Sequence, residues 1–283
     1  MTLNYGKISV WFFLAGCLVY LILLLPSCGV NLHLYEYFGV GLLYYSLLNL
    51  VFWTCLRGFV LQIAICSTFL GICNAVGVML LCFSTLPWNI FGCYIFFLSF
   101  FHYSEFLAVA LNKPDSVAVD SFLLNHSFEY GAAAFASWAE FWIEQWLFPG
   151  LKQYYHVSVV GAAMCAGGEV LRKLAMFTAR TNFNHVVKSE YEEGHRLVTS
   201  GVYAWFRHPS YVGWFYWSLG TQLILINPVC FLGYTVMSWR FFHDRVWMEE
   251  ITLLKFFGED YYRYQQQVGT GLPFIRGYEI NPS

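Results

Sequence analysis

The chain has 283 residues, of which 58% are hydrophobic and only 11% are charged. Soluble globular domains carry about 25% charged residues, so this composition excludes an ordinary soluble protein. The 15 basic and 17 acidic residues give a net charge of −2, which argues against nucleic acid as a partner because phosphate binding needs a basic face. Together with 21% aromatic residues, these values indicate a polytopic membrane protein.

The first 110 residues contain only four charged side chains, separated by long uncharged stretches. A helix rises 1.5 Å per residue, so about 20 apolar residues cross a 30 Å hydrocarbon core. The stretches predict four membrane helices, near residues 8–25, 37–56, 58–83 and 88–110. The first resembles a signal peptide, but no clear small-x-small cleavage site follows it and more spans come next, so we favour a retained helix.

Two further helices are predicted, over Tyr130–Leu147 and Val157–Phe177. The first carries Glu140 and Glu144 one turn apart, and carboxylates inside a membrane are a hint of function. The second carries Glu169 and Lys173 four residues apart. For this pair we favour a local ion pair at a helix end over a functional role.

The last apolar block, Tyr211–Trp239, has no charge and is interrupted by Asn227-Pro228. One interpretation is a single kinked helix, and the other is a hairpin in which Asn227 caps a second helix that begins with Pro228. The hairpin gives eight spans and places 14 of the 15 basic residues on one side, with only Lys152 on the other. Because a single helix would move the five tail charges to the opposite side, the positive-inside rule favours the hairpin, with both termini in the cytosol.

The hairpin brings two polar clusters to one membrane face. Arg207–Tyr211 begins its first helix, and Arg240–Glu250 follows the apolar part of its second helix. Arg245 and Glu249 lie one turn apart and therefore project from one helical face. Pro209 leaves free backbone N–H groups at a helix start, which suit a carboxylate. Both clusters are therefore expected to share one site.

The loop Arg180–Phe206 is the only long polar connection, and it contains His185, His195 and Tyr203, so we expect it to cover the site. Each feature also has a purely structural interpretation. Arg, His and Tyr commonly anchor membrane helices at the interface, and an Arg–Glu pair one turn apart is commonly a surface ion pair. The convergence of both clusters beside a polar loop favours a site. The sequence has no GxSxG elbow and no HExxH motif, so neither a hydrolase nor a metal is expected.

Four segments of the chain resemble the isoprenylcysteine carboxyl methyltransferase family: Gly201–Trp214, Asn227-Pro228, Glu249-Glu250 and Thr270–Ile275. The RHPxYxG element at residues 207–213 is also similar to phospholipid methyltransferases and sterol reductases, so the combination of all four is the more specific signal. The resemblance is strong over residues 155–277 and rests on hydropathy alone before them.

This resemblance implies an enzyme of the endoplasmic reticulum membrane that uses S-adenosylmethionine. It would methylate the terminal carboxylate of a farnesylated or geranylgeranylated cysteine in CaaX-processed proteins such as Ras-like GTPases. The implied cofactor-binding residues are His195, Arg196, Leu197, Val198, Tyr203, His208, Pro209, Ser210, Tyr211 and Glu249. Lys188 occupies a position that is often polar in the family. Arg245 would hold the substrate carboxylate, and Arg245 and Glu249 are the catalytic candidates.

The implied chemistry agrees with these residue types. A terminal carboxylate has a pKa near 3.5, so it is already ionised at neutral pH and needs no general base. Arg is always charged and holds a carboxylate through two parallel hydrogen bonds, and a Glu suits the ammonium end of the cofactor. The sequence leaves open whether Glu249 or Glu250 is the working carboxylate.

Two rival interpretations are kept. The first is a related enzyme, either a phospholipid amine methyltransferase, which would need a base near the methyl group, or an NADPH-dependent sterol reductase, which would need more basic residues for the dinucleotide phosphates. The second is a channel or transporter, which predicts internal repeats or helices broken in both halves, and we find neither pattern.

We expect an all-α polytopic membrane protein with about eight transmembrane helices and a cofactor site at the cytosolic face. Residues 1–128 would form the first four helices and a connecting loop. Residues 129–283 would form the catalytic membrane core, with the last four helices, a cofactor loop over residues 178–210 and a cytosolic tail. Besides its substrate, its one expected partner is the lipid bilayer.

Overall fold

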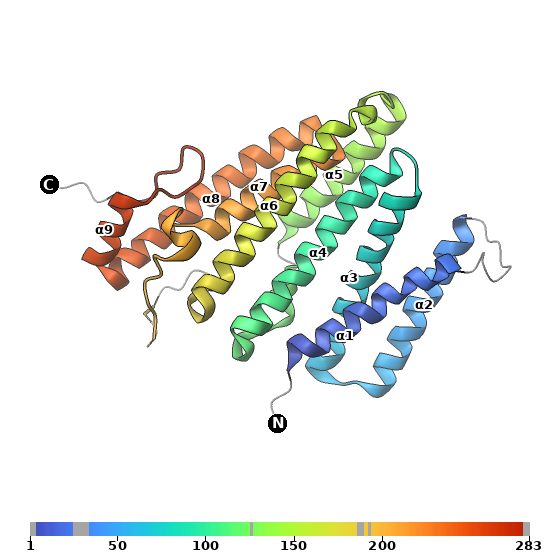
Figure 1. The fold of residues 1–283 in the computed structure, drawn as a ribbon, viewed down its shortest axis with the longest axis horizontal. Helices are drawn as coiled ribbons and strands as arrows, with labels where there is room; N and C mark the ends of the chain where they lie inside the picture. The colour runs from blue at the N-terminus through green and yellow to red at the C-terminus, as the bar shows by residue number, and fades with distance from the viewer. Residues whose placement is uncertain (1–3, 25–33, 125–126, 186–189, 192–193, 280–283) are drawn as a thin grey trace. The chain divides into compact units, whose positions relative to one another are not determined.

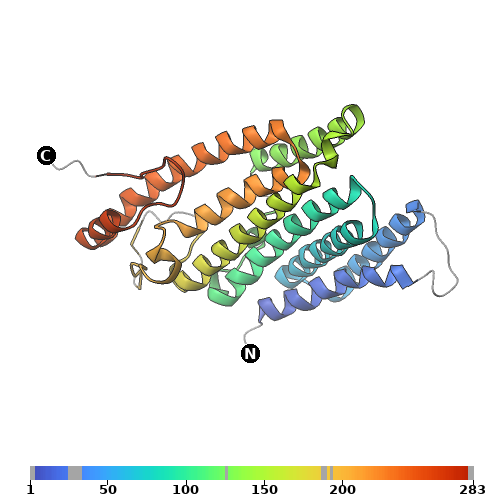
Figure 2. The same cartoon turned by 45° about the horizontal axis from the view of Figure 1, so that its top comes forward.

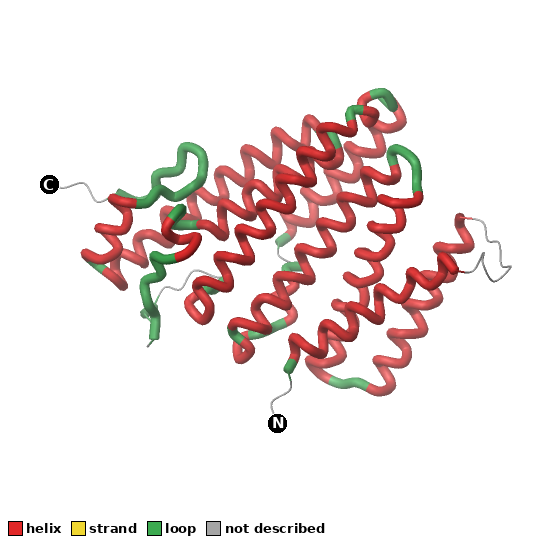
Figure 3. Tube along the Cα trace, viewed as in Figure 1, coloured by secondary structure: helices red, strands yellow, loops and turns green. Residues whose placement is uncertain are grey.

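The computed structural model describes residues 4–24, 34–124, 127–185, 190–191 and 194–279. Every regular element in these ranges is a helix (Figure 3), so the all-α expectation is confirmed for the described residues. The chain packs into two compact units, Met1–Ser158 and Val159–Ser283, and each is considered by itself. The functional boundary expected after residue 128 stays a prediction.

The described residues of the first unit form five α-helices and the beginning of a sixth (Figure 1): α1 (Tyr5–Cys17), α2 (Leu34–Cys55), α3 (Gly58–Phe83), α4 (Trp88–Asn112), α5 (Phe128–Leu147) and α6 (Tyr155–Ala179). The expected bounds of α3 are matched. The expected first helix, residues 8–25, is instead α1 followed by a 3₁₀ helix over Leu18–Leu24.

Among the described residues, three segments are long and apolar enough to cross a membrane: Tyr5–Ile22, Gly58–Phe83 and Trp88–Asn112. Gly39–Cys55 is apolar but shorter. The membrane character of the chain is therefore supported, and the count of eight spans stays a prediction.

Small residues allow the helices of the first unit to approach closely. A Cβ atom added at Gly16 of α1 would lie 2.3 Å from the Thr68 carbonyl oxygen of α3, and one at Gly77 of α3 would lie 2.7 Å from the Phe96 nitrogen of α4. Contacts of this kind are a common way to pack helices in lipid, where burial of apolar surface contributes little.

Glu144, one of the two glutamates noted in α5, has a structural partner. Its Oε2 atom lies 2.7 Å from the Nζ atom of Lys152, and Lys152 is only 1% exposed. The Lys152 ammonium also lies 4.8 Å from the ring centre of Phe141. This buried ion pair explains the position of Glu144 without a catalytic role.

The second unit contains the rest of α6 and three further helices: α7 (Pro209–Leu225), α8 (Pro228–Phe257) and α9 (Glu259–Gln267). Helices α6, α7 and α8 run side by side in both views (Figures 1 and 2). The α7–α8 hairpin is confirmed, and Pro228 begins α8 as expected. Asn227 is at the N-cap position, but its side chain makes no capping hydrogen bond. It is buried and faces Gln222, with Nδ2 3.5 Å from Oε1.

Pairs of glycines determine how α6 packs on α7. Gly161 lies against Gly220, and Gly168 lies against Gly213, so the spacing is seven residues on each helix and the helices run antiparallel. A Cβ atom at Gly213 would lie 2.5 Å from the Gly168 carbonyl oxygen and 2.8 Å from the Arg172 nitrogen. This contact brings the C-terminal part of α6 next to the start of α7.

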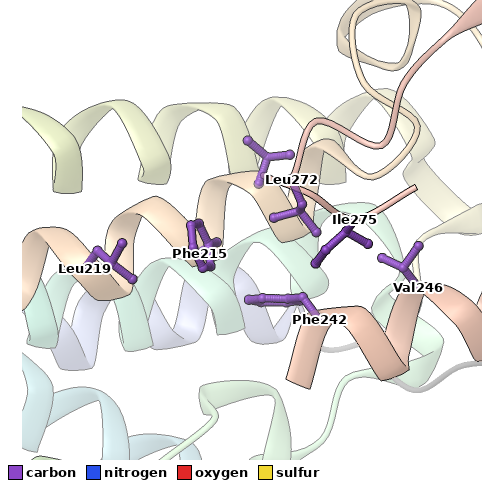
Figure 4. Packing of buried hydrophobic residues seen from close by; sticks show 7 residues of the cluster. Phe215, Leu219, Phe242, Val246, Leu272 and Ile275 are labelled. Carbon is purple, nitrogen blue, oxygen red and sulfur yellow. The ribbon is translucent and has the colours of Figure 1, made fainter. Parts of the chain in front are cut away.

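The C-terminal segment after α9 folds back onto the hairpin. Leu272 and Ile275 join a buried cluster with residues of α7 and α8 (Figure 4): Val212, Phe215, Leu219, Phe242 and Val246. Packing contacts of this kind between side chains hold helices together in lipid. The cluster therefore fixes the beginning of α7, the middle of α8 and the tail as one body.

The local ion pair expected between Glu169 and Lys173 in α6 is confirmed. Glu169 Oε1 lies 3.1 Å from Lys173 Nζ, as expected for oppositely charged residues one helical turn apart.

Candidate active site

A pocket opens where α7 begins, with an empty volume of about 700 Å³, part of which is open to solvent. The parts of the second unit that line it are the end of α6 and the turn after it, residues 196–198, Tyr203, Arg207 with the start of α7, and the C-terminal part of α8 with α9. Segments far apart in the sequence therefore enclose one space.

The pocket brings together all but one of the expected cofactor-binding residues: Arg196, Leu197, Val198, Tyr203, His208, Pro209, Ser210, Tyr211 and Glu249. The exception, His195, lines an adjoining pocket that shares Arg196, Tyr211 and Glu249. Lys188 lies outside the described residues. Arg245 does not line either pocket, and it contacts Tyr211 at their edge.

Helix α7 begins at Pro209, as expected, with His208 at the N-cap position. The expectation of several free amides there is wrong in part. The N–H groups of Tyr211 and Val212 both donate to the His208 carbonyl oxygen, at 3.0 Å. The Val212 bond is the ordinary first bond of the helix, whereas the Tyr211 bond tightens the first turn and satisfies one of the amides that an ideal helix start would leave for a ligand.

Tyr211 joins Arg245 to Glu249. The Arg245 Nε atom donates to the Tyr211 hydroxyl oxygen at 3.1 Å, and that hydroxyl donates to Glu249 Oε2. The expectation that Arg245 and Glu249 share one helical face is confirmed, because both contact one phenol. The Nη2 atom of Arg245 also donates to the His185 carbonyl oxygen, which ties the loop before α7 to α8.

Glu250 has a different environment from its neighbour Glu249. It is fully buried, and its Oε1 atom lies 2.8 Å from Arg207 Nε, 3.1 Å from His208 Nε2 and 3.1 Å from the Tyr261 hydroxyl. Its Oε2 atom accepts from Gln265 Nε2 at 3.0 Å and from a backbone N–H of the tail at 2.8 Å. Glu250 is therefore the centre of a network that joins α7, α8, α9 and the tail.

This network also fixes the charge of Glu250. Burial raises the pKa of the Glu250 carboxyl, but the hydrogen bonds and charges of His208 and Arg207 lower it further, and the pKa lies below its ordinary value of 4.5. The carboxylate is therefore ionised at neutral pH and saturated with donors. Of the two glutamates, only Glu249 lines the pocket.

Arg207 completes the network on the side of the tail. Its Nη2 atom donates to the Arg276 carbonyl oxygen at 2.7 Å, and its Nη1 atom donates to the carbonyl oxygens of Gln265 and Val268. Its backbone N–H donates to the Gly269 carbonyl oxygen at 2.9 Å. The residues before α7 are thus held in place by groups about 40 to 70 positions away in the chain.

Arg172 of α6 is a further residue near the pocket that the sequence did not indicate. It is 1% exposed, and its Nη1 atom donates to the Ser210 hydroxyl at 2.7 Å. Its guanidinium lies 4.7 Å from the ring centre of Trp214. Ser210, a pocket residue on the first turn of α7, is therefore held by a buried cation.

Asn182 is a second such residue. It lines both pockets, and its Oδ1 atom accepts from the Arg196 backbone N–H at 2.9 Å. It thereby joins the turn after α6 to the strip of residues 196–198. No sequence motif predicts an Asn in this role. Leu253 and Phe257, four and eight residues after Glu249, also line the pocket, and helical spacing alone could have predicted them.

The chain is similar to known proteins along most of its length. The model of the isoprenylcysteine carboxyl methyltransferase family matches residues 161–255. The chain is 57% identical to protein-S-isoprenylcysteine O-methyltransferase of Xenopus laevis, over 78% of this chain and 76% of that protein. It is 48% identical to the protein of the same name from Tribolium castaneum, over 97% of this chain and 98% of that protein. A solved structure described as the eukaryotic intramembrane Ras methyltransferase ICMT matches with a TM-score of 0.94 and 46% identity, covering 97% of this chain and 99% of that one.

Proposed function

The chain belongs to the isoprenylcysteine carboxyl methyltransferase family, and from this premise we propose that it transfers a methyl group to the C-terminal carboxylate of a prenylated cysteine. The product is a methyl ester, and the methyl donor is S-adenosylmethionine. The observation that carries the proposal is the pocket at the start of α7, with the Arg245–Tyr211–Glu249 chain of hydrogen bonds at its edge.

The pocket residues suit this donor. S-adenosylmethionine supplies a methyl group on a positively charged sulfonium, and it also carries an ammonium and a purine. Glu249 offers a carboxylate to a cation, and Leu253 and Phe257 offer apolar surface along the same helix. Residues 196–198 and Ser210 lie around them. A mixed lining of this kind, with a few placed polar groups, is typical of small-molecule sites.

Arg245 is suited to hold the substrate carboxylate. A guanidinium has five N–H donors, and Arg245 uses one at Nε and one at Nη2 in its contacts with Tyr211 and His185. Within the part of the chain that the structure describes, donors on Nη1 and Nη2 remain on the same rigid plane for a carboxylate. Because that carboxylate is ionised at neutral pH, the protein's task is to orient it and to exclude water.

The prenyl chain and the membrane set the route of entry. Each buried CH₂ group is worth about 0.8 kcal/mol, so a 15-carbon chain partitions into the bilayer. We propose entry between helices, from the bilayer, and prenylated CaaX-processed proteins as the substrates. The site then faces the cytosol from an endoplasmic reticulum membrane, on the side where the basic residues gather.

The test uses the purified full chain in lipid vesicles with S-adenosylmethionine labelled in its methyl group. Two acceptors are compared, N-acetyl farnesylcysteine and phosphatidylethanolamine. We expect labelled methyl ester, released as methanol by base, from the first acceptor only. Label on the amine lipid, or no transfer to the prenylcysteine by protein that binds the cofactor, would overturn the proposal.

A further inference from the structure

The tail presents one aromatic side chain to the outside. Phe274 is 95% exposed, whereas Leu272 and Ile275 on either side of it are buried in the cluster of the second unit. A single exposed apolar side chain needs no explanation by itself. Phe274 differs because the surrounding structure holds it outward.

Three observations show that the loop is held. Phe274 has a φ of +59°, which is unfavourable for a bulky residue and persists only when its surroundings impose it. The hydroxyl of Thr270 donates to the Ile275 carbonyl oxygen, which closes the loop. The indole Nε1 atom of Trp239 donates to the Pro273 carbonyl oxygen at 2.8 Å, which fastens the loop to α8.

The register of the tail on α8 places Phe274 along the hairpin. Pro273 contacts Trp239 through the hydrogen bond just described. Further along, the ring of Tyr278 packs against the ring of Trp247, with the two ring centres 5.1 Å apart. The uncharged block of the chain ends at Trp239. Trp residues concentrate at the membrane–water boundary, so Phe274, next to Pro273, is at the depth of that boundary.

Two cations accompany the aromatic side chain. Arg240 follows Trp239 on α8, Arg276 follows Phe274 by two residues, and both are exposed. An apolar side chain with arginines at the cytosolic boundary suits a leaflet that contains anionic lipids, because the ring enters the acyl region and the guanidinium groups meet the headgroup phosphates.

We propose that residues 270–276 bind the surface of the bilayer, with Phe274 inserted at the headgroup–acyl boundary and Arg240 and Arg276 on anionic headgroups. The proposal rests on the membrane orientation in the proposed function. It links the lipid to the active site, because the Arg276 carbonyl oxygen accepts from Arg207 and Gly277 packs on Glu250. Lipid that fixes the position of this loop therefore also stabilises the network of Glu250, Arg207 and His208.

The test is photocrosslinking of the full chain, purified and reconstituted in vesicles of phosphatidylcholine and phosphatidylserine. Benzoylphenylalanine replaces Phe274, and adducts are identified by mass spectrometry after proteolysis. Leu232, 66% exposed on the apolar part of α8, is the lipid-facing control position. Gln266, exposed on α9, is the water-facing control position.

We expect lipid adducts at position 274 at a level close to that at 232 and several-fold above that at 266. A level equal to that at 266, or an adduct to a second protein chain, would overturn the proposal. Enrichment of phosphatidylserine over its share of the vesicle supports the role of the arginines, and adducts in proportion to that share would refute it.

Methyl transfer to N-acetyl farnesylcysteine is measured in the same vesicles with the unmodified protein. Active protein without lipid adducts at 274 would refute the lipid contact and leave the proposed function intact. Lipid adducts at 274 in protein that binds the cofactor but transfers no methyl group would refute the function alone.

Discussion

At the scale of single residues, two adjacent glutamates lie in different environments. Glu249 faces the pocket and accepts from the Tyr211 hydroxyl, whereas Glu250 is fully buried and saturated by Arg207, His208 and other donors. Consecutive helical positions point about 100° apart, so one helix can direct one carboxylate at a ligand and the next into the protein. This difference yields two predictions with opposite readouts.

Glu249→Gln is expected to weaken the binding of S-adenosylmethionine by about 1.5 to 3 kcal/mol, the range for a hydrogen bond to a charged group. The fold should persist, because Glu249 is only partly buried. Isothermal titration of the purified protein measures the affinity. Glu259→Gln is the matched control, since Glu259 is an exposed carboxylate paired with Arg263 and should bind the cofactor like wild type. Unchanged affinity in folded Glu249→Gln would remove Glu249 from the cofactor site.

Glu250→Gln is expected to lower stability, by about 3 to 5 kcal/mol for a broken buried ion pair, in thermal unfolding at pH 7. The pH dependence gives a sharper readout. Because the pKa of Glu250 is lowered in the folded state, its contribution is fully present above the ordinary value of 4.5 and is lost as pH falls through the lowered pKa.

The difference in melting temperature between wild type and Glu250→Gln should therefore shrink as pH falls below about 4.5. Melting curves of both proteins in one detergent, taken at matched pH values, measure this difference. If the difference in melting temperature stays constant as the pH is lowered, the Glu250 carboxylate is not the stabilising group.

At the scale of elements, the contact of α6 with α7 sets the position of the pocket. Gly213→Ala should destabilise the protein by about 1 to 3 kcal/mol, because its Cβ atom would lie 2.5 Å from the Gly168 carbonyl oxygen and the helices would have to separate. It should also reduce cofactor affinity, since Arg172 would move away from Ser210. Gly233→Ala in α8 is the matched control, because a Cβ atom there meets nothing within 4 Å.

Thermal unfolding of both variants, with the cofactor titration, checks this prediction. Gly233→Ala should be neutral or stabilising, because alanine favours a helix over glycine. Equal melting temperatures for the two variants would mean that the α6–α7 glycines do not limit the approach of these helices.

The hairpin was predictable because its signals are local. Asn227-Pro228 marks a turn within an uncharged block, and the positions of the basic residues decide between a kink and a turn. Arg245 and Glu249 could be placed on one face by helical spacing alone. The resemblance of the motifs implied other pocket residues, among them Tyr203 and Ser210. The structure brings these residues together in the pocket.

Other parts of the site could not be predicted, because their partners are distant in sequence. Arg172 meets Ser210 across 38 positions, and Arg207 meets the tail across 69. Asn182 is an ordinary polar residue in the sequence, and only the fold shows that it holds Arg196. The tightened first turn of α7, which occupies the Tyr211 amide, is likewise a property of geometry rather than of composition.

At the scale of the whole molecule, the distribution of basic residues predicts the orientation of the chain in the membrane. A glycosylation acceptor sequence inserted after Gln153, next to Lys152, should be modified in microsomes, because this turn is expected to face the lumen. The same sequence appended after the C-terminus should stay unmodified. Modification of the C-terminal sequence would contradict both the cytosolic tail and the shared site at the start of α7.

At this scale we propose that, in the full chain in its bilayer, the hairpin, the pocket and the lipid phase together present a prenylcysteine carboxylate to Arg245. An ionised carboxylate needs an anchor rather than a base, so the geometry of the guanidinium should matter as well as its charge. Arg245→Lys keeps the charge and loses the fork. It should therefore lose nearly as much activity as Arg245→Ala, about 30-fold to several thousand-fold for about 2 to 5 kcal/mol.

The decisive measurement is the rate of methyl ester formation on N-acetyl farnesylcysteine by wild type, Arg245→Lys and Arg245→Ala in vesicles, at equal cofactor occupancy. Lys255→Ala, a change of an exposed cation on the same helix, serves as the control and should retain activity. We expect both Arg245 variants to bind the cofactor and to fail to transfer the methyl group. Near-wild-type turnover by Arg245→Ala would contradict it.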